Sequence, residues 1–404
     1  MIAPLLLLAV LLLPVAHLKV TWFGLPLYLP EMAVFCAAVS FWFSPKRKEG
    51  VSLPDKGVLI GIGLFLLGAL FSFLANPLSL TGLGMLKSWF FFPALFGYLV
   101  WFEMKEVSRR SKFLLVWFLV IAAVATRSLS FFVSGEMTYD GRLTGDFPSP
   151  NFLAFFLAPG IFIALSFFLN AIKEQKRWNE IFFGITLIVF FFALFLTHSY
   201  GVWFGVIVAL LVFFFGRAFV NGTQKEWWII GLIFFVALSL FGFDQGNEKW
   251  QTLIHQEERS SLSSRVMIWQ AAVRIAGDHP VLGIGVGRFQ EMYLAYQVYF
   301  PPYLEWAVPE PHNIFLALFL ATGFVGLIGF LIFFRRMMLL LIQTVLVFGE
   351  TKKQQDAVLM LSLWTLFLLY GLFDTPYFKN DLAYLFFLTV ALSLPVKDTY
   401  SSIR

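Results

Sequence analysis

The sequence predicts an all-helical integral membrane protein with about twelve transmembrane helices. Of its 404 residues, 59% are hydrophobic and 13% are charged, whereas soluble domains average about 45–50% apolar and about 25% charged residues. The mean hydropathy is +0.81, and the chain contains 52 phenylalanines and 13 tryptophans. This composition excludes both a soluble globule and a disordered chain. Most of the surface is therefore expected to face lipid.

Each predicted span is a run of mostly apolar residues, close to the roughly 20 that an α-helix needs to cross a bilayer. The first run starts without a basic residue and ends at a poor cleavage site, so we expect a retained helix rather than a signal peptide. The predicted spans cover residues 2–18, 25–44, 57–75, 81–102, 113–134, 151–170, 180–197, 200–220, 227–243, 312–334, 356–373 and 382–396.

Most of the 29 lysines and arginines fall in alternate loops between these spans. Cytoplasmic loops carry the excess of basic residues, so this asymmetry predicts cytoplasmic N- and C-termini. The same rule accounts for the formal net charge of +5, and we expect no nucleic-acid partner. Cys36 is the single cysteine, and the sequence contains no His-x-x-x-His pattern or acidic cluster. We therefore predict no disulfide, metal or other cofactor.

Residues 1–404 are interpreted as one polytopic membrane domain with one long outward-facing loop at residues 244–311. Loops beyond about 12–15 residues are usually functional or disordered. Within this loop, Ser261–Gly277 places apolar residues at helical spacing. This pattern predicts an amphipathic helix that lies on the bilayer.

Two basic residues lie inside predicted spans, Lys87 and Arg127. A charge at the centre of a membrane helix costs on the order of 2.5–3.5 kcal/mol on insertion scales. Either these side chains reach the lipid headgroups, or they face a wet cavity on the outward side. A polar outer loop holds Arg142, whose planar fork suits phosphate oxygens, and Asn151, which either caps the next helix or joins a site.

His312 is the histidine with the best-defined position, because a proline-flanked turn delivers it to the outer end of a predicted span. An imidazole can accept a proton at neutral pH. We expect Glu305 or Glu310 to orient it, although a structural role for the histidine stays open. Asp374 and Lys379 are expected to form only a solvated outer turn.

Two classes of function fit this pattern of outward arginines and one histidine. A transferase would bind a lipid-linked diphosphate with its arginines and use the histidine as a base. A transporter would attract an anionic solute with the same arginines, but transporters place polar sites near the midplane of the membrane. The polar residues here gather at one face, which favours interfacial chemistry.

Several ordered motifs resemble the O-antigen ligase and polymerase superfamily. They lie mainly within about 60 residues, and we expect a ligase- and polymerase-like core over residues 180–340. An earlier outer loop also resembles the family, with Arg-Leu-Thr-Gly from Arg142 and Pro150-Asn151. The main motifs are Arg265-x3-Trp269, His279-Pro280-x-x-Gly283-x-Gly285, His312-Asn313 and Thr322-Gly323.

The resemblance implies a metal-independent, inverting glycosyltransferase of the GT-C type in lipopolysaccharide biosynthesis. It would move a glycan from undecaprenyl diphosphate to lipid A-core at the periplasmic face of the bacterial inner membrane. By position, Arg142 and Arg265 would hold the diphosphate, and His312 would activate the acceptor hydroxyl. Further candidates for the diphosphate are Arg127, Lys87 and Arg288, and supporting candidates are Asn313, Glu310, Trp269 and Asn151.

The chain departs from the family pattern at one place that bears on the donor. Many members carry Ser-Arg-Gly where this chain has Ser199-Tyr200-Gly201, so another cation would supply the missing charge or the diphosphate is held differently. Protein O-oligosaccharyltransferases of the superfamily generally carry extra C-terminal sequence after the last span, so we do not expect that activity here. Ligase is favoured over polymerase, because a single Arg-x10-Gly match, Arg274 with Gly285, carries little weight.

Overall fold

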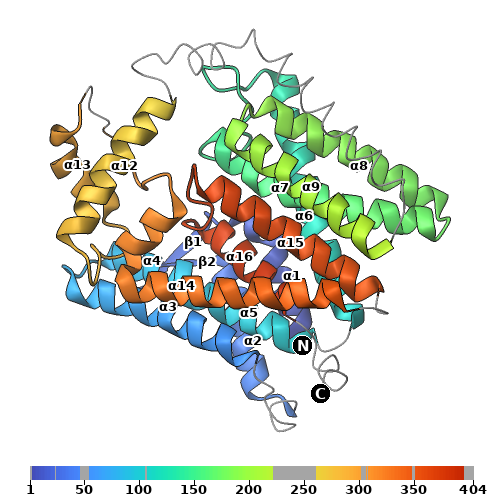
Figure 1. Ribbon diagram of the computed structural model, residues 1–404, viewed down its shortest axis with the longest axis horizontal. Coiled ribbons are helices and arrows are strands. Elements are labelled where there is room, and N and C mark those ends of the chain that lie inside the picture. Colours follow the sequence, from blue (N-terminus) through green and yellow to red (C-terminus); the bar gives the residue numbers. More distant parts are fainter. Residues whose placement is uncertain are drawn as a thin grey trace. The chain divides into compact units, whose positions relative to one another are not determined.

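The computed structural model describes residues 2–22, 24–45, 54–104, 107–221, 261–301, 306, 308–347 and 351–394. These residues divide into two compact units, which we describe separately (Figure 1). The first unit is drawn from Met1–Ser111, Gln256–Leu340 and Gly371–Arg404, and the second from Lys112–His255 and Leu341–Tyr370.

In the described part of the chain, seven helices are long and apolar enough to cross a membrane. They confirm a multi-pass membrane protein, since each has at least the length of a bilayer span. They are α3 (Lys56–Ala75), a helix from α4 (Leu80–Met85) to α5 (Phe92–Glu103), most of α6 (Val107–Ser134), α7 (Pro150–Lys173), α8 (Arg177–Leu196), α9 (Tyr200–Asn221) and α14 (Ile314–Leu346).

The other five predicted spans do not correspond to described helices that are both long and apolar enough to cross a membrane. The helices α1 (Ile2–Leu11), α2 (Leu29–Trp42) and α16 (Asn380–Ser393) are apolar but shorter than a bilayer span. The helix α15 (Thr351–Gly371) is long enough but begins with a polar stretch. Residues 227–243 lie outside the described residues. The number of twelve spans therefore stays a prediction.

An antiparallel hairpin departs from the all-helical prediction. Strand β1 (Lys19–Trp22) pairs with β2 (Leu25–Tyr28), so the span predicted at 25–44 becomes helical only at Leu29. Prolines explain the difference. Pro26 disfavours helical backbone in the residue before it, whereas Pro30 stands in the first turn of α2, where its missing N–H has no helical partner to lose.

The second unit is built from α6, α7, α8, α9 and α15. Phenylalanine rings fill the space between the helices, with Phe118 of α6 in contact with Phe190 of α8. Glycines allow the closest approaches: a Cβ on Gly160 would stand 2.6 Å from Ile121, and one on Gly216 would stand 2.8 Å from Val358. Small residues at helix crossings are typical of membrane bundles.

In the first unit, α3 and α14 cross with their backbones nearly touching. A Cβ on Gly68 would stand 2.4 Å from the Cα atom of Gly326, and one on Gly329 would stand 2.4 Å from the backbone nitrogen of Phe65. No larger side chain fits at either position without displacing backbone. This crossing holds the N-terminal half of α14, which follows His312, against α3.

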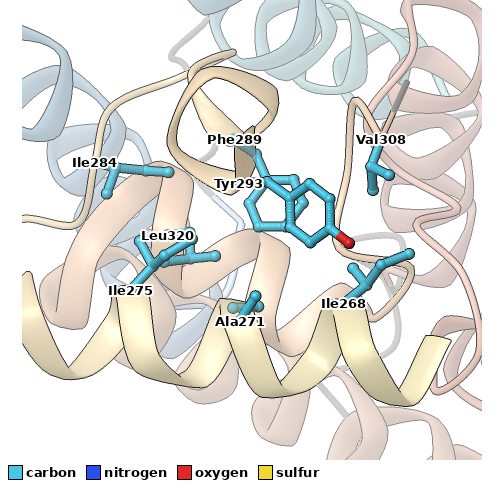
Figure 2. Close-up of a cluster of buried hydrophobic side chains, with 9 residues drawn as sticks. Ile268, Ala271, Ile275, Ile284, Phe289, Tyr293, Val308 and Leu320 are labelled. Atoms are coloured by element: carbon cyan, nitrogen blue, oxygen red, sulfur yellow. The ribbon is translucent and has the colours of Figure 1, made fainter. Parts of the chain in front are cut away.

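The predicted amphipathic helix exists as α12 (Ser261–Asp278), but protein rather than lipid covers its apolar face. Figure 2 shows this face packed against the side chains of Phe289 and Tyr293 from α13 (Phe289–Tyr296) and against Leu320 of α14. Val266 and Val273, which belong to the predicted apolar stripe, remain exposed, so the contact of α12 with the bilayer stays a prediction. The residues of α12 in this cluster are Ile268, Ala271, Ala272 and Ile275.

Two backbone hydrogen bonds hold the glycine-rich loop after α12 against α14, and we call this pair of bonds the clasp. The N–H of Ile284 donates to the carbonyl of Leu320 at 2.8 Å, and the N–H of Phe324 donates to the carbonyl of Val281 at 2.9 Å. α14 is broken at Gly323, which has φ +66. Gly283 also has φ +66, and its Cβ would stand 2.3 Å from the Leu320 carbonyl oxygen. Gly283 and Gly323 thus allow the two backbones to come close enough for these hydrogen bonds to form.

Replacing Gly283 by alanine is expected to lower the thermal stability, because a Cβ would collide with the Leu320 carbonyl and a left-handed conformation costs a non-glycine residue about 1–2 kcal/mol. Gly277→Ala is the matched control, since nothing lies within 4 Å of its Cβ position. Thermal unfolding in detergent should show a lower Tm for Gly283→Ala and an unchanged or higher Tm for Gly277→Ala. An unchanged Tm for Gly283→Ala would contradict the clasp.

Candidate functional site

His312 stands in a strained position immediately before α14. Its φ is +49, in the left-handed region that few non-glycine residues adopt. The next residue holds the turn: the Asn313 side-chain oxygen accepts from the N–H groups of Phe315 and Leu316, and its amide donates to the carbonyl of Leu372 at 3.1 Å. Strained backbone persists where its surroundings over-determine it, as they do at functional sites.

The imidazole of His312 pairs with a buried carboxylate. Its Nδ1 lies 3.0 Å from Oδ1 of Asp374, whose residue is only 2% exposed. The same oxygen accepts from the N–H of Thr375 at 2.9 Å. Because an ionised carboxylate only accepts hydrogen bonds, a neutral imidazole in this pairing carries its proton on Nδ1 and its lone pair on Nε2. The His312 side chain is 33% exposed, so the imidazole is accessible from the surface.

The expectation of a solvated turn at Asp374 and Lys379 is therefore wrong. Residues 374–378 are all buried, and burial lowers the pKa of Lys379. The expected partners of His312 also change: Asp374 takes the place given to Glu310, and Glu305 lies outside the described residues. The one sequence feature that could have pointed to Asp374 was its place as a single acidic residue directly after a predicted span. Its partner is 62 positions away, which no local pattern reveals.

Helix α12 contacts both loops of this pair. Arg265 Nε donates to the carbonyl of Phe373 at 2.8 Å, next to Asp374, and Trp269 Nε1 donates to the carbonyl of His312 at 3.2 Å. Arg265 and Trp269 are four residues apart and thus lie on one face of the helix. The structure brings Arg265, Trp269, His312 and Asn313 together, as the order of the motifs suggests, and adds Asp374.

Glu310 lies beside this group in a mostly apolar pocket, lined also by Phe289, Leu320 and Phe378. Burial raises the pKa of Glu310 to about 8, and the negative charge of Asp374 adds to the effect. A carboxyl group in this state is mostly neutral at pH 7. Glu310 can therefore donate a hydrogen bond near the pair.

Two other predicted cations of the first unit are already matched with carboxylates. Lys87 pairs with Glu31, which is almost fully buried and also accepts from the hydroxyl of Ser88. Arg288 pairs with Glu291 at 3.1 Å and contacts Asn76. The charge of Lys87 is therefore matched by a carboxylate of the protein itself. Neither lipid headgroups nor a wet cavity is needed to accommodate it.

In the second unit, Arg142 holds a polar loop together. Its Nε donates to the carbonyl of Thr197 and its Nη2 to the side-chain oxygen of Asn151, both at 2.8 Å. The same oxygen accepts from the hydroxyl of Ser199 at 3.0 Å. Burial lowers the pKa of Arg142, while the neighbouring Asp140 opposes that shift.

Asn151 does not cap the helix that follows the loop. Ser149 is the N-cap of α7, and its hydroxyl accepts from the N–H of Phe152. Asn151 lies in the first turn, where its side chain accepts from Arg142 instead. Arg127 forms an ion pair with Asp146, and its side chain is 63% exposed.

Glu310→Gln is expected to reduce the pH dependence of stability. The folded protein keeps a proton on Glu310 up to about pH 8, whereas the ordinary pKa is 4.5. The folded state thus binds more protons than the unfolded state in this window, and stability falls as pH rises through it. The variant avoids this loss, so its Tm should exceed that of the wild type increasingly from pH 5 to pH 8.

Glu291→Gln is the control, because Glu291 is an exposed carboxylate on the same part of the chain. It should leave the slope of Tm against pH unchanged. Identical slopes for the wild type and Glu310→Gln would show that Glu310 does not keep its proton.

Comparison with known families identifies one domain. Residues 185–331 match the family model described as O-antigen ligase. The match includes Arg265, Trp269 and His312, whereas Arg142 and Asp374 lie outside it. No curated protein matches the chain. Over residues 185–331, the match supports the resemblance of the chain to the O-antigen ligase superfamily.

Proposed function

We propose that this protein transfers a glycan from undecaprenyl diphosphate to a sugar hydroxyl of lipid A-core at the periplasmic face of the bacterial inner membrane. The family domain supports an activity of the O-antigen ligase and polymerase type. The observation that carries the proposed reaction is the pairing of His312 with the buried Asp374, because it leaves Nε2 of an accessible imidazole able to accept a proton.

In the proposed reaction, His312 Nε2 takes the proton of the acceptor hydroxyl as its oxygen bonds to the anomeric carbon of the glycan. The bond from that carbon to the diphosphate oxygen breaks, and its electron pair leaves with undecaprenyl diphosphate. Attack opposite the leaving group inverts the configuration at the carbon. The imidazolium is stabilised by Asp374 and then releases its proton to water. A positioned base of this kind typically contributes 10²–10⁴-fold.

Arg265 and Arg142 are proposed to bind the departing diphosphate. A guanidinium has five N–H donors in a planar fork that matches phosphate oxygens, and hydrogen bonds to charged groups contribute about 1.5–3 kcal/mol each. These contacts let the reaction proceed without a divalent metal. The ion pairs of Lys87, Arg127 and Arg288 support structural roles for those three residues.

The remaining residues of the site are proposed to hold it in shape. Trp269 and Asn313 donate to loop carbonyls on either side of the pair, and Asn151 orients Arg142. Glu310, neutral at pH 7, is proposed to donate to the acceptor.

The reaction can be tested with purified protein in liposomes, a lipid diphosphate-linked glycan and candidate acceptors, with and without a chelator. A ligase forms the product on lipid A-core and a polymerase forms it on a second lipid-linked glycan. Uptake of an anion without any glycan product would support a transporter and contradict the proposal. Loss of transfer in the chelator would contradict metal independence.

His312→Ala and Asp374→Asn are each expected to lower the transfer rate by about 10²- to 10⁴-fold, since one removes the base and the other removes its orientation. Both proteins should remain folded and present in the membrane, so that cells lose glycan transfer but not the protein. Single-turnover transfer in liposomes measures the rate. Full activity of His312→Ala would remove the assigned base.

Arg142→Ala is expected to lower transfer about 10- to 100-fold, the loss of one or two charge-assisted hydrogen bonds in the transition state. Arg127→Ala is the matched control: it also removes an ion-paired arginine of the second unit, but an exposed one. It should change transfer less than about 3-fold, as exposed ion pairs contribute little. Equal losses in the two variants would contradict the assignment of Arg142.

A further inference from the structure

In the span that runs from α4 to α5, a proline deprives one backbone carbonyl of its usual helical donor. Residues Leu86–Phe91 form a π-helical turn, in which the N–H of Phe92 donates to the carbonyl of Lys87. The carbonyl of Trp89 would ordinarily accept from the residue four positions later, but this residue is Pro93, which has no N–H. Buried backbone carbonyls rarely stay without a partner, and π-helical turns are frequent at functional sites.

Tyr377 supplies the missing partner. Its hydroxyl donates to the carbonyl of Trp89, and its ring packs edge-on against Phe90 and Phe386. The indole Nε1 of Trp89 in turn donates to the side-chain oxygen of Asn380 at 3.0 Å. One helical residue thus contacts both the loop after α15, at Tyr377, and the first residue of α16, Asn380.

This loop carries Asp374, three positions before Tyr377. The two intervening residues are Thr375 and Pro376, and both are buried. Pro376 has a fixed φ and restricts the residue before it, so the backbone between Asp374 and Tyr377 has few free torsions. An anchor at Tyr377 therefore determines where the Asp374 carboxylate stands.

We propose that the contacts of Tyr377 and Asn380 with Trp89 position Asp374 against His312. Tyr377 and Asn380 are positioning residues that act through Asp374, and the inference rests on the proposed transfer function. The effect should fall on the rate of the bound substrates rather than on their binding, since misplacement of a catalytic group by about 1 Å can cost up to 10²-fold.

The test compares Tyr377→Phe with Tyr384→Phe in the liposome transfer assay. Both tyrosines belong to the first unit and are 1% exposed, but the Tyr384 hydroxyl has no hydrogen-bond partner among the described residues. Tyr377→Phe should lower kcat by about 10-fold or more with KM for donor and acceptor within about twofold of the wild type. Tyr384→Phe should match the wild type in both.

The Tyr377→Phe and Tyr384→Phe substitutions are then measured again in the Asp374→Asn background. If Tyr377 acts through Asp374, its substitution should have no further effect there, because the two changes remove the same interaction. A merely structural role would reduce transfer by the same factor in both backgrounds, and that result would overturn the proposal. Wild-type kcat for Tyr377→Phe would overturn it as well.

Asn380→Ala decides the question if Tyr377→Phe does not accumulate as folded protein. It removes the second contact with Trp89, and it should lower kcat in the wild-type background but not in Asp374→Asn. These results are separate from a failure of the transfer function itself, which would appear as no product from the wild type or as full activity of His312→Ala.

Discussion

The pairing of the buried Asp374 carboxylate with His312 is the interaction on which the rest of the site depends. A carboxylate taken out of water is costly unless it accepts hydrogen bonds or meets a charge, and Asp374 has the imidazole and the N–H of Thr375. The ring in turn gains a fixed orientation. The proposed role of Nε2 as a base therefore rests on this pairing more than on the histidine alone.

Side chains that donate to backbone carbonyls without a regular helical partner hold the site together. Arg265 and Trp269 of α12 donate to the carbonyls of Phe373 and His312, and Tyr377 donates to that of Trp89. The carbonyls of Phe373 and His312 lie outside helices, and that of Trp89 loses its usual donor at Pro93. Each of these long side chains donates to one such carbonyl. The motif residues thus link loops that are distant in sequence, while the glycines of the clasp let the backbones approach.

The sequence predicted the features that repeat locally and missed those that depend on distant contacts. Apolar runs and helical spacing predicted the membrane helices and α12, and ordered motifs brought Arg265, Trp269 and His312 into one hypothesis. Asp374 was missed because its partner is far along the chain. The hairpin before α2 was missed because hydropathy outweighed Pro26. The sequence left two roles open for Asn151, helix cap or site residue, and the structure gives the cap to Ser149, two positions earlier.

The most direct test of the central claim is chemical rescue of His312→Gly protein by imidazole in the transfer assay. If His312 is the base, the variant is nearly inactive and its transfer rate rises with the concentration of free-base imidazole, whereas Arg265→Ala gains nothing. Transfer by His312→Gly at the wild-type rate without imidazole would contradict the account.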